Sequence, residues 1–123
     1  MAADKIQKFT DLIAWQEAHA LVLGVYKATD EFPSKEQFGL TSQMRRAVIS
    51  VTSNIAEGFS RQTTADKIHF YVMAHGSTTE IQNQLLAARD IGYLKRTLFD
   101  QLANQTVRVH KLITGLIKSI KEK

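Results

Sequence analysis

Five polar side chains recur at helical spacing in the middle of the chain. They supply two amides, a guanidinium, a hydroxyl and a carboxylate, which are groups that could form an active site. Residues three or four apart lie on one side of a helix, so these groups would share one flank of its apolar face. The five residues are Gln43, Arg46, Ser50, Asn54 and Glu57.

This stripe carries no recognisable catalytic pattern. Catalysis needs a base, an acid or a nucleophile, brought together in a pocket. Asn54 does not transfer protons usefully, and no second carboxylate lies one or two turns from Glu57. The chain contains no P-loop and no GxGxxG, and its serines show no partnership with a histidine and an acid. We therefore expect no enzyme and no catalytic residue. The enzymatic alternative requires the stripe and Glu80 to meet in one cluster that solvent reaches.

A polar seam between the second and third helices is the structural interpretation of the same residues. Side chains that border a core are partly buried, and each needs a hydrogen-bonding partner. In an antiparallel hairpin that turns near residues 61–62, Arg46 lies level with Glu80 and should pair with it. We expect Asn54 to bond groups across the two helices, and Glu57 to accept N–H groups at the start of the third helix. The seam comprises Gln43, Arg46, Ser50, Asn54, Glu57, Ser77 and Glu80.

Apolar residues recur at helical spacing in four stretches that short polar segments separate. Gly39 costs helix stability and allows a kink or break within the second stretch. Four helices with three short connections predict one all-α domain over residues 1–123, an up-down-up-down antiparallel four-helix bundle. The helices are expected near residues 11–31, 35–57, 65–91 and 97–121.

Several residues have the character of helix caps. Thr10, Thr97 and one of Thr63 and Thr64 are expected N-caps, because a hydroxyl can accept one of the free N–H groups of a first turn. Gly58 is expected to end the second helix as a C′ glycine.

Composition excludes several classes of site. The chain has no cysteine, which removes disulfides, thiol catalysis and cysteine-based zinc sites and fits a reducing cytosol. No two of the four histidines lie three or four residues apart, so we expect no metal and no cofactor. The chain has no secretory h-region and no apolar run near the roughly 20 residues of a membrane span. We therefore expect a cytoplasmic protein without a membrane partner.

Positive charge is concentrated towards the C-terminal end. The chain has a formal net charge of +4, and residues 95–123 hold seven basic and two acidic side chains. Such a bias favours sequence-independent contact with phosphates, although a solvated helix face explains it equally well. In the Arg45–Arg46 pair, Arg45 points away from the seam, towards the surface or a second subunit. The candidate nucleic-acid-binding residues are Arg45, Arg108, Lys111, Lys118 and Lys121.

Four motifs together are distinctive. The motifs are Phe9-x-Asp11-Leu12-x-x-Trp15-Gln16-x-Ala18, Phe32-Pro33-x-x-Glu36-x-x-Gly39-Leu40-Thr41-x-Gln43-x-Arg45-Arg46-Ala47, Ser50-x-x-x-Asn54-Ile55-Ala56-Glu57-Gly58 and Ala74-x-Gly76-Ser77-x-x-Glu80. Together they resemble the bacterial four-helix-bundle family of 23S rRNA intervening-sequence proteins, also called the "S23 ribosomal protein" family, over nearly the whole chain.

The resemblance implies a fold more firmly than a function. It implies a small cytosolic four-helix bundle that forms a ring-like homo-oligomer, a pentamer in relatives. A related group serves as accessory protein to the reverse transcriptase of diversity-generating retroelements and binds nucleic acid with a basic surface. We therefore expect an oligomeric bundle that binds RNA or DNA through basic residues, as an accessory to a protein partner. The alternative is a structural or adaptor oligomer with no nucleic-acid role.

Overall fold

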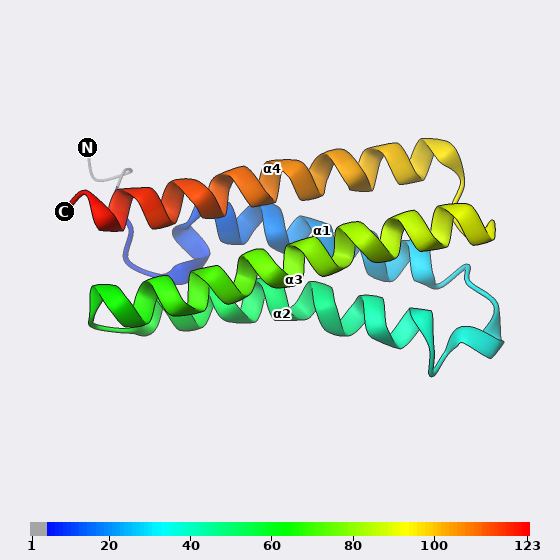
Figure 1. Cartoon of the computed structure of the whole chain (residues 1–123), viewed down its shortest axis with the longest axis horizontal. Helices are drawn as coiled ribbons and strands as arrows, with labels where there is room; N and C mark the ends of the chain where they lie inside the picture. The colour runs from blue at the N-terminus through cyan, green and yellow to red at the C-terminus, as the bar shows by residue number, and fades with distance from the viewer. Residues whose placement is uncertain (1–4) are drawn as a thin grey trace.

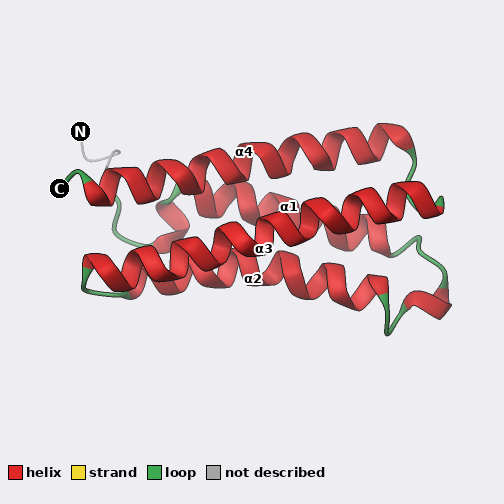
Figure 2. Ribbon diagram, viewed as in Figure 1, coloured by secondary structure: helices red, strands yellow, loops and turns green. Residues whose placement is uncertain are grey.

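The computed structural model of the chain describes residues 5–123 and places four long helices side by side (Figure 1). The described residues contain helices and loops but no strand (Figure 2). Two short 3₁₀ helices, η2 and η3, precede the first and second long helices. In chain order the elements are η2 (Phe9–Asp11), α1 (Ile13–Thr29), η3 (Ser34–Glu36), α2 (Leu40–Ser60), α3 (Thr64–Ile91) and α4 (Arg96–Lys121).

Each long helix packs against two neighbours, in the cyclic order α1, α2, α3, α4. The α1–α2 and α3–α4 connections lie at one end of the bundle, and the α2–α3 connection lies at the other end with the C-terminus (Figure 1). All four helices contribute fully buried apolar side chains to one core, which removes them from water and stabilises the bundle. These residues include Leu21, Ile55, Ile81 and Ile113.

The helix starts differ from the predicted caps at two places. A 3₁₀ turn precedes α1, because the Asp11 carboxylate accepts the backbone N–H groups of Gln7 and Lys8, each at 3.0 Å. These two bonds lower the pKa of the Asp11 carboxyl. The predicted cap at Thr10 is therefore wrong, and α1 begins at Ile13. In α4, the N-cap position belongs to Lys95, so the predicted cap at Thr97 is also wrong.

The second predicted helix is broken at Gly39, so α2 begins at Leu40 instead of near residue 35. The Glu36 carboxylate stabilises this break by accepting the Leu40 N–H at 3.1 Å and the Tyr93 hydroxyl at 2.8 Å. Both bonds lower the pKa of the Glu36 carboxyl, the Leu40 N–H more than the hydroxyl. The connection before α2 is thereby fastened to the start of the α3–α4 connection.

Gly58 does not end the second helix, because α2 continues to Ser60. This glycine lies instead where α2 meets α3, and a Cβ at this position would stand 2.6 Å from Cε1 of the buried Tyr71 ring. At the other side of the turn, the Thr63 hydroxyl accepts the Asp66 N–H at 3.1 Å and caps α3 as predicted. The left-handed Gly92, with φ of 98°, follows the last residue of α3.

Candidate nucleic-acid interface

Three residues of the predicted polar seam form one hydrogen-bonded cluster between α2 and α3. The buried Asn54 side chain donates from Nδ2 to the Ser50 carbonyl at 2.8 Å and to Ser50 Oγ at 3.0 Å, both on its own helix, so the predicted bond from Asn54 across to α3 is wrong. Ser50 Oγ lies 2.8 Å from Ser77 Oγ on the facing helix. This chain of bonds satisfies polar groups that border the core and ties α2 to α3 at one register.

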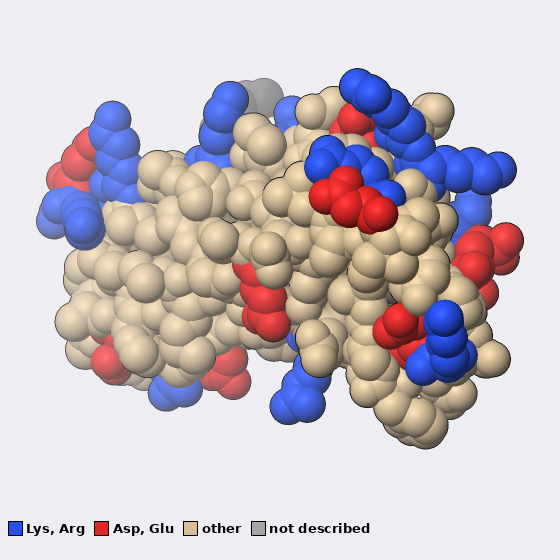
Figure 3. Space-filling model, turned by 45° about the vertical axis from the view of Figure 1, so that its right-hand side comes forward, with Lys and Arg blue, Asp and Glu red and all other residues tan. Residues whose placement is uncertain are grey.

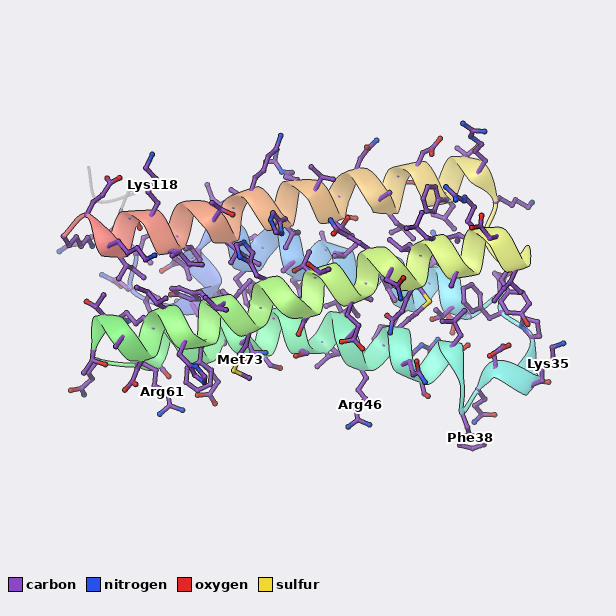
Figure 4. All side chains as sticks on the ribbon, viewed as in Figure 1. Lys35, Phe38, Arg46, Arg61, Met73 and Lys118 are labelled. Atoms are coloured by element: carbon purple, nitrogen blue, oxygen red, sulfur yellow. The ribbon has the colours of Figure 1, made fainter. Side chains whose placement is uncertain are left out.

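The predicted pairing of Arg46 with Glu80 is wrong. Arg46 is exposed and points away from the bundle (Figure 4), and among residues 5–123 it forms no salt bridge. Glu80 instead lies 3.4 Å from the amide nitrogen of Gln84, one turn along the same helix. Gln43 is also exposed. Gln43, Arg46 and Glu80 are all exposed on the outer side of their helices, so they do not join the cluster around Asn54.

Glu57 also differs from its predicted role. Its carboxylate pairs with Arg61 at 3.1 Å within the same turn region, while Thr63 provides the N-cap of α3. The stripe therefore divides into a buried part around Asn54 and an exposed part that includes Arg46 and Glu57. This division leaves the stripe without the single solvent-reached cluster that the enzymatic alternative requires.

Arg45 is engaged within the bundle. Its Nε donates to Thr29 Oγ1 at 2.8 Å, and its Nη2 contacts Asp30 at 2.8 Å and the Tyr26 carbonyl at 3.3 Å. The guanidinium also lies 4.5 Å from the centre of the Tyr26 ring. A cation at the last turn of α1 is favourable for the helix dipole. Arg45 therefore fastens the end of α1 to α2, which reduces its availability to a ligand.

The remaining candidates lie on α4. Arg108 pairs with Glu17 of α1 at 2.9 Å, so part of its charge is balanced within the chain. Three lysines are exposed and form no salt bridge within the described part of the chain: Lys111, Lys118 and Lys121. At the opposite end of α4, basic side chains gather over the region of the α3–α4 connection (Figure 3). The α4 surface therefore presents positive charge at both ends.

Two histidines form a contact between α3 and α4 that their spacing in the sequence does not predict. The rings of His75 and His110 stack with centroids 4.2 Å apart. His75 Nε2 lies 3.1 Å from the His110 carbonyl and 3.0 Å from Thr114 Oγ1. Because a carbonyl oxygen can only accept, Nε2 is the donor of the bond to His110.

A hollow of about 470 Å³ opens beside this stack. The surface that faces the hollow is mostly apolar, and its lining residues also include an imidazole, a hydroxyl, two ammonium groups and the Glu122 carboxylate. Hydroxyl and ammonium donors of this kind are the usual contacts to phosphate oxygens in nucleic-acid complexes. The residues that line it are His75, Thr114, Ile117, Lys118, Lys121 and Glu122.

The stacked histidines predict a pH dependence of stability. Burial, and then the nearby charge of His75, lower the pKa of His110 below its ordinary 6.5. Below about pH 6.5 the unfolded chain therefore takes up a proton that folded His110 resists, and stability falls as the pH decreases. We expect His110→Gln to flatten the dependence of the unfolding free energy on pH between about 5 and 7. Urea denaturation at several pH values across that range measures this dependence.

The control for this prediction is His69→Gln, because His69 is exposed on α3. Its pH dependence should match that of the wild type. If the unfolding free energy of His110→Gln depended on pH as steeply as that of the wild type, the loss of stability at low pH could not be assigned to the stacked histidines.

Two further classes of site are absent from the part of the chain that the structure describes. Within residues 5–123, no group of three or more histidine, aspartate or glutamate side chains is placed to hold a metal ion. None of the described helices combines the length and the apolar character that a membrane crossing needs.

Comparison with known proteins connects this architecture to a family. The family model described as "23S rRNA-intervening sequence protein" matches residues 10–115. A crystal structure of a protein of unknown function from the S23 ribosomal protein family of Bacteroides thetaiotaomicron superimposes with a TM-score of 0.79. The two chains are 20% identical, and the match covers 86% of this chain and 96% of the other, which shows a shared fold. No curated protein matches the chain.

Proposed function

We propose that this chain, which belongs to the 23S rRNA-intervening sequence protein family, is a non-enzymatic protein that binds RNA or DNA without sequence specificity. The observation that carries the proposal is the outer surface of α4, where Lys111, Lys118 and Lys121 are exposed and make no salt bridge among the described residues. Two of these lysines also line the hollow beside His75 and Thr114. Ammonium groups of this kind bind phosphates and release counterions, which drives association.

We further propose that the protein acts in the cytoplasm as a ring-like homo-oligomer, with a pentamer as the expected form. The resemblance to ring-forming relatives supports this assembly. One chain carries a modest net charge of +4. A pentamer would carry about +20 and would repeat each basic surface around the ring, which strengthens the electrostatic potential that attracts a polyanion.

Fluorescence anisotropy with a labelled, structured RNA tests the binding proposal. The wild type should bind at low salt, and log K should fall linearly with log salt concentration. Three phosphate contacts per chain predict a slope of roughly −2 to −3. The Lys118→Ala/Lys121→Ala variant should lose about one to two units of that slope and bind more weakly, since each lost contact removes one counterion-release contribution.

A matched control removes the same charge elsewhere. Lys27→Ala/Lys35→Ala also lowers the net charge by two, and both lysines are exposed at the opposite end of the bundle from the C-terminus. In this variant, log K should fall with log salt concentration as steeply as in the wild type. Absence of binding at low salt, or binding that ignores salt, would refute the nucleic-acid proposal, and equal losses in both variants would refute the α4 site.

A structural or adaptor oligomer without a nucleic-acid role is the alternative. The observation in its favour is exposed apolar surface, above all Phe38, whose relative exposure is 89%. The alternative predicts a stable oligomer whose mass does not change when RNA is added.

A further inference from the structure

Three aromatic rings at the start of α1 form one stacked cluster. The Trp15 and His19 rings lie face to face, with centroids 4.7 Å apart and planes inclined by 12°. The Phe9 ring meets Trp15 edge-on, with centroids 5.6 Å apart and planes inclined by 68°. Trp15 is half-buried and packs against the core, whereas Phe9 and His19 are exposed. We call these three rings the aromatic platform.

Hydrogen bonds around η2 hold the aromatic platform in place. The Asp11 carboxylate accepts two backbone N–H groups and so fixes the 3₁₀ turn that carries Phe9. The Gln16 amide donates to the Thr10 carbonyl at 3.0 Å and ties this turn to α1. The rings are therefore positioned before any ligand arrives, which reduces the conformational entropy that is lost on binding.

The His19 ring presents one flat face to solvent. Trp15 covers the opposite face, and no hydrogen bond or salt bridge among residues 5–123 involves the imidazole. The ring is thus ordered by stacking while its outer face has no partner in the described chain. A planar heteroaromatic group can stack on this face as on any other aromatic ring, with centroids roughly 4.5–7 Å apart.

Positive charge lies beside the aromatic platform. Lys5 and Lys8 come just before Phe9 in the chain, and both are exposed and form no salt bridge among the described residues. Lys111 of α4 lines a hollow together with Asp11, so it also stands next to η2. Stackable rings with ammonium groups around them are the two features by which proteins bind single-stranded nucleic acids.

We propose that the aromatic platform binds an unpaired base of a single-stranded nucleic acid, which stacks on the exposed face of His19. This inference rests on the proposed nucleic-acid binding and specifies its form, because the α4 lysines contact phosphates while the platform selects unpaired strands. In a duplex each base is already stacked between its neighbours, so only a base that is splayed out can join the ring. Every base has a π-face, so this selection requires no sequence specificity.

Tryptophan fluorescence tests the aromatic platform directly, because Trp15 is the only tryptophan of the chain. Addition of an oligo(dT) strand of about 12 nucleotides, a usual site size for such proteins, should change the intensity of Trp15 emission at low salt. A duplex of the same length should change it much less. A strand of the same length that is abasic throughout keeps the phosphates but has no base, and it should leave the emission unchanged.

Two substitutions separate the flat ring of His19 from its bulk. His19→Leu still covers Trp15 but offers no flat face, and it should bind oligo(dT) roughly 5- to 150-fold more weakly, the usual loss of one base–aromatic stack. His19→Phe keeps a flat ring without ring nitrogens and should bind oligo(dT) like the wild type. Neither should change affinity for the duplex. All variants should retain the helical circular dichroism of the wild type, since the position is exposed.

His69→Leu is the matched control. It also replaces an exposed histidine, but on α3 and outside the aromatic platform. Its affinity for oligo(dT) should equal that of the wild type. Equal losses in His69→Leu and His19→Leu would contradict a site at His19.

The outcomes separate the aromatic platform from the broader proposal. If His19→Leu bound oligo(dT) as tightly as the wild type, or if the abasic strand changed Trp15 emission as much as oligo(dT), the platform would be overturned and the salt-dependent binding at α4 would stand. A His19→Phe variant as weak as His19→Leu would show that the ring nitrogens, not a stacking face, carry the contact. If neither oligo(dT) nor the structured RNA bound at low salt, nucleic-acid binding itself would be refuted, and the platform with it.

Discussion

Gly58→Ala should lower the free energy of unfolding by about 1–3 kcal/mol, the usual cost of overpacking a tight contact. Alanine alone would favour the helix by about 1 kcal/mol, so packing must oppose and exceed that gain. The added Cβ would stand 2.6 Å from Tyr71 Cε1 and 3.2 Å from the Lys67 carbonyl oxygen. The Tyr71 ring is buried, and the carbonyl belongs to helix backbone, so neither can yield without moving α3 away from α2.

Gly76→Ala is the matched control for this prediction. Gly76 also lies within a helix, but a Cβ there would meet no atom within 4 Å. It should therefore raise stability by about 0.5–1 kcal/mol through helix propensity. Urea denaturation of both variants under one set of conditions shows whether the unfolding free energy falls in Gly58→Ala and rises in Gly76→Ala. Equal stabilisation at both positions would show that α2 and α3 can separate at Gly58 without cost.

Local periodicity predicted the four helices because each must bury one apolar stripe. Thr63 was readable as a boundary, since its side chain acts on the backbone next to it. The starts of α1 and α2 were harder to predict. Asp11 and Glu36 side chains compete with helical bonding there, and Glu36 also depends on Tyr93, a residue distant in the sequence. The periodicity of apolar residues contains no information about such a tertiary partner.

In the candidate site, too, only the contacts that local spacing determines could be predicted from the sequence. Asn54 and Ser50 lie one turn apart, and antiparallel register places Ser77 beside them, so spacing alone could indicate that cluster. The direction of Arg46 depends on the rotation of α2 about its axis, which spacing determines only coarsely. His75 and His110 lie 35 residues apart on different helices. Their stacking requires the packed register of α3 against α4, which no local pattern contains.

Arg45→Met should lower the free energy of unfolding by about 2 kcal/mol, in the range for hydrogen bonds to charged groups. Methionine keeps much of the apolar stem but removes the bonds to Thr29, Asp30 and the end of α1. The Arg45 side chain is only 28% exposed, so solvent replaces those bonds incompletely. Affinity for RNA should change little, since this guanidinium is already engaged within the bundle.

The neighbouring Arg46→Met removes the same charge from an exposed side chain that forms no salt bridge among residues 5–123. Its effect on stability should stay within about 0.5 kcal/mol. Urea denaturation and RNA anisotropy on both variants therefore separate a structural arginine from a phosphate-binding one. If Arg45→Met weakens RNA binding more than Arg46→Met does, with stability unchanged, Arg45 belongs to the interface and its contacts with α1 open in the complex. If stability falls and affinity does not, Arg45 stabilises the fold and does not belong to the RNA-binding surface.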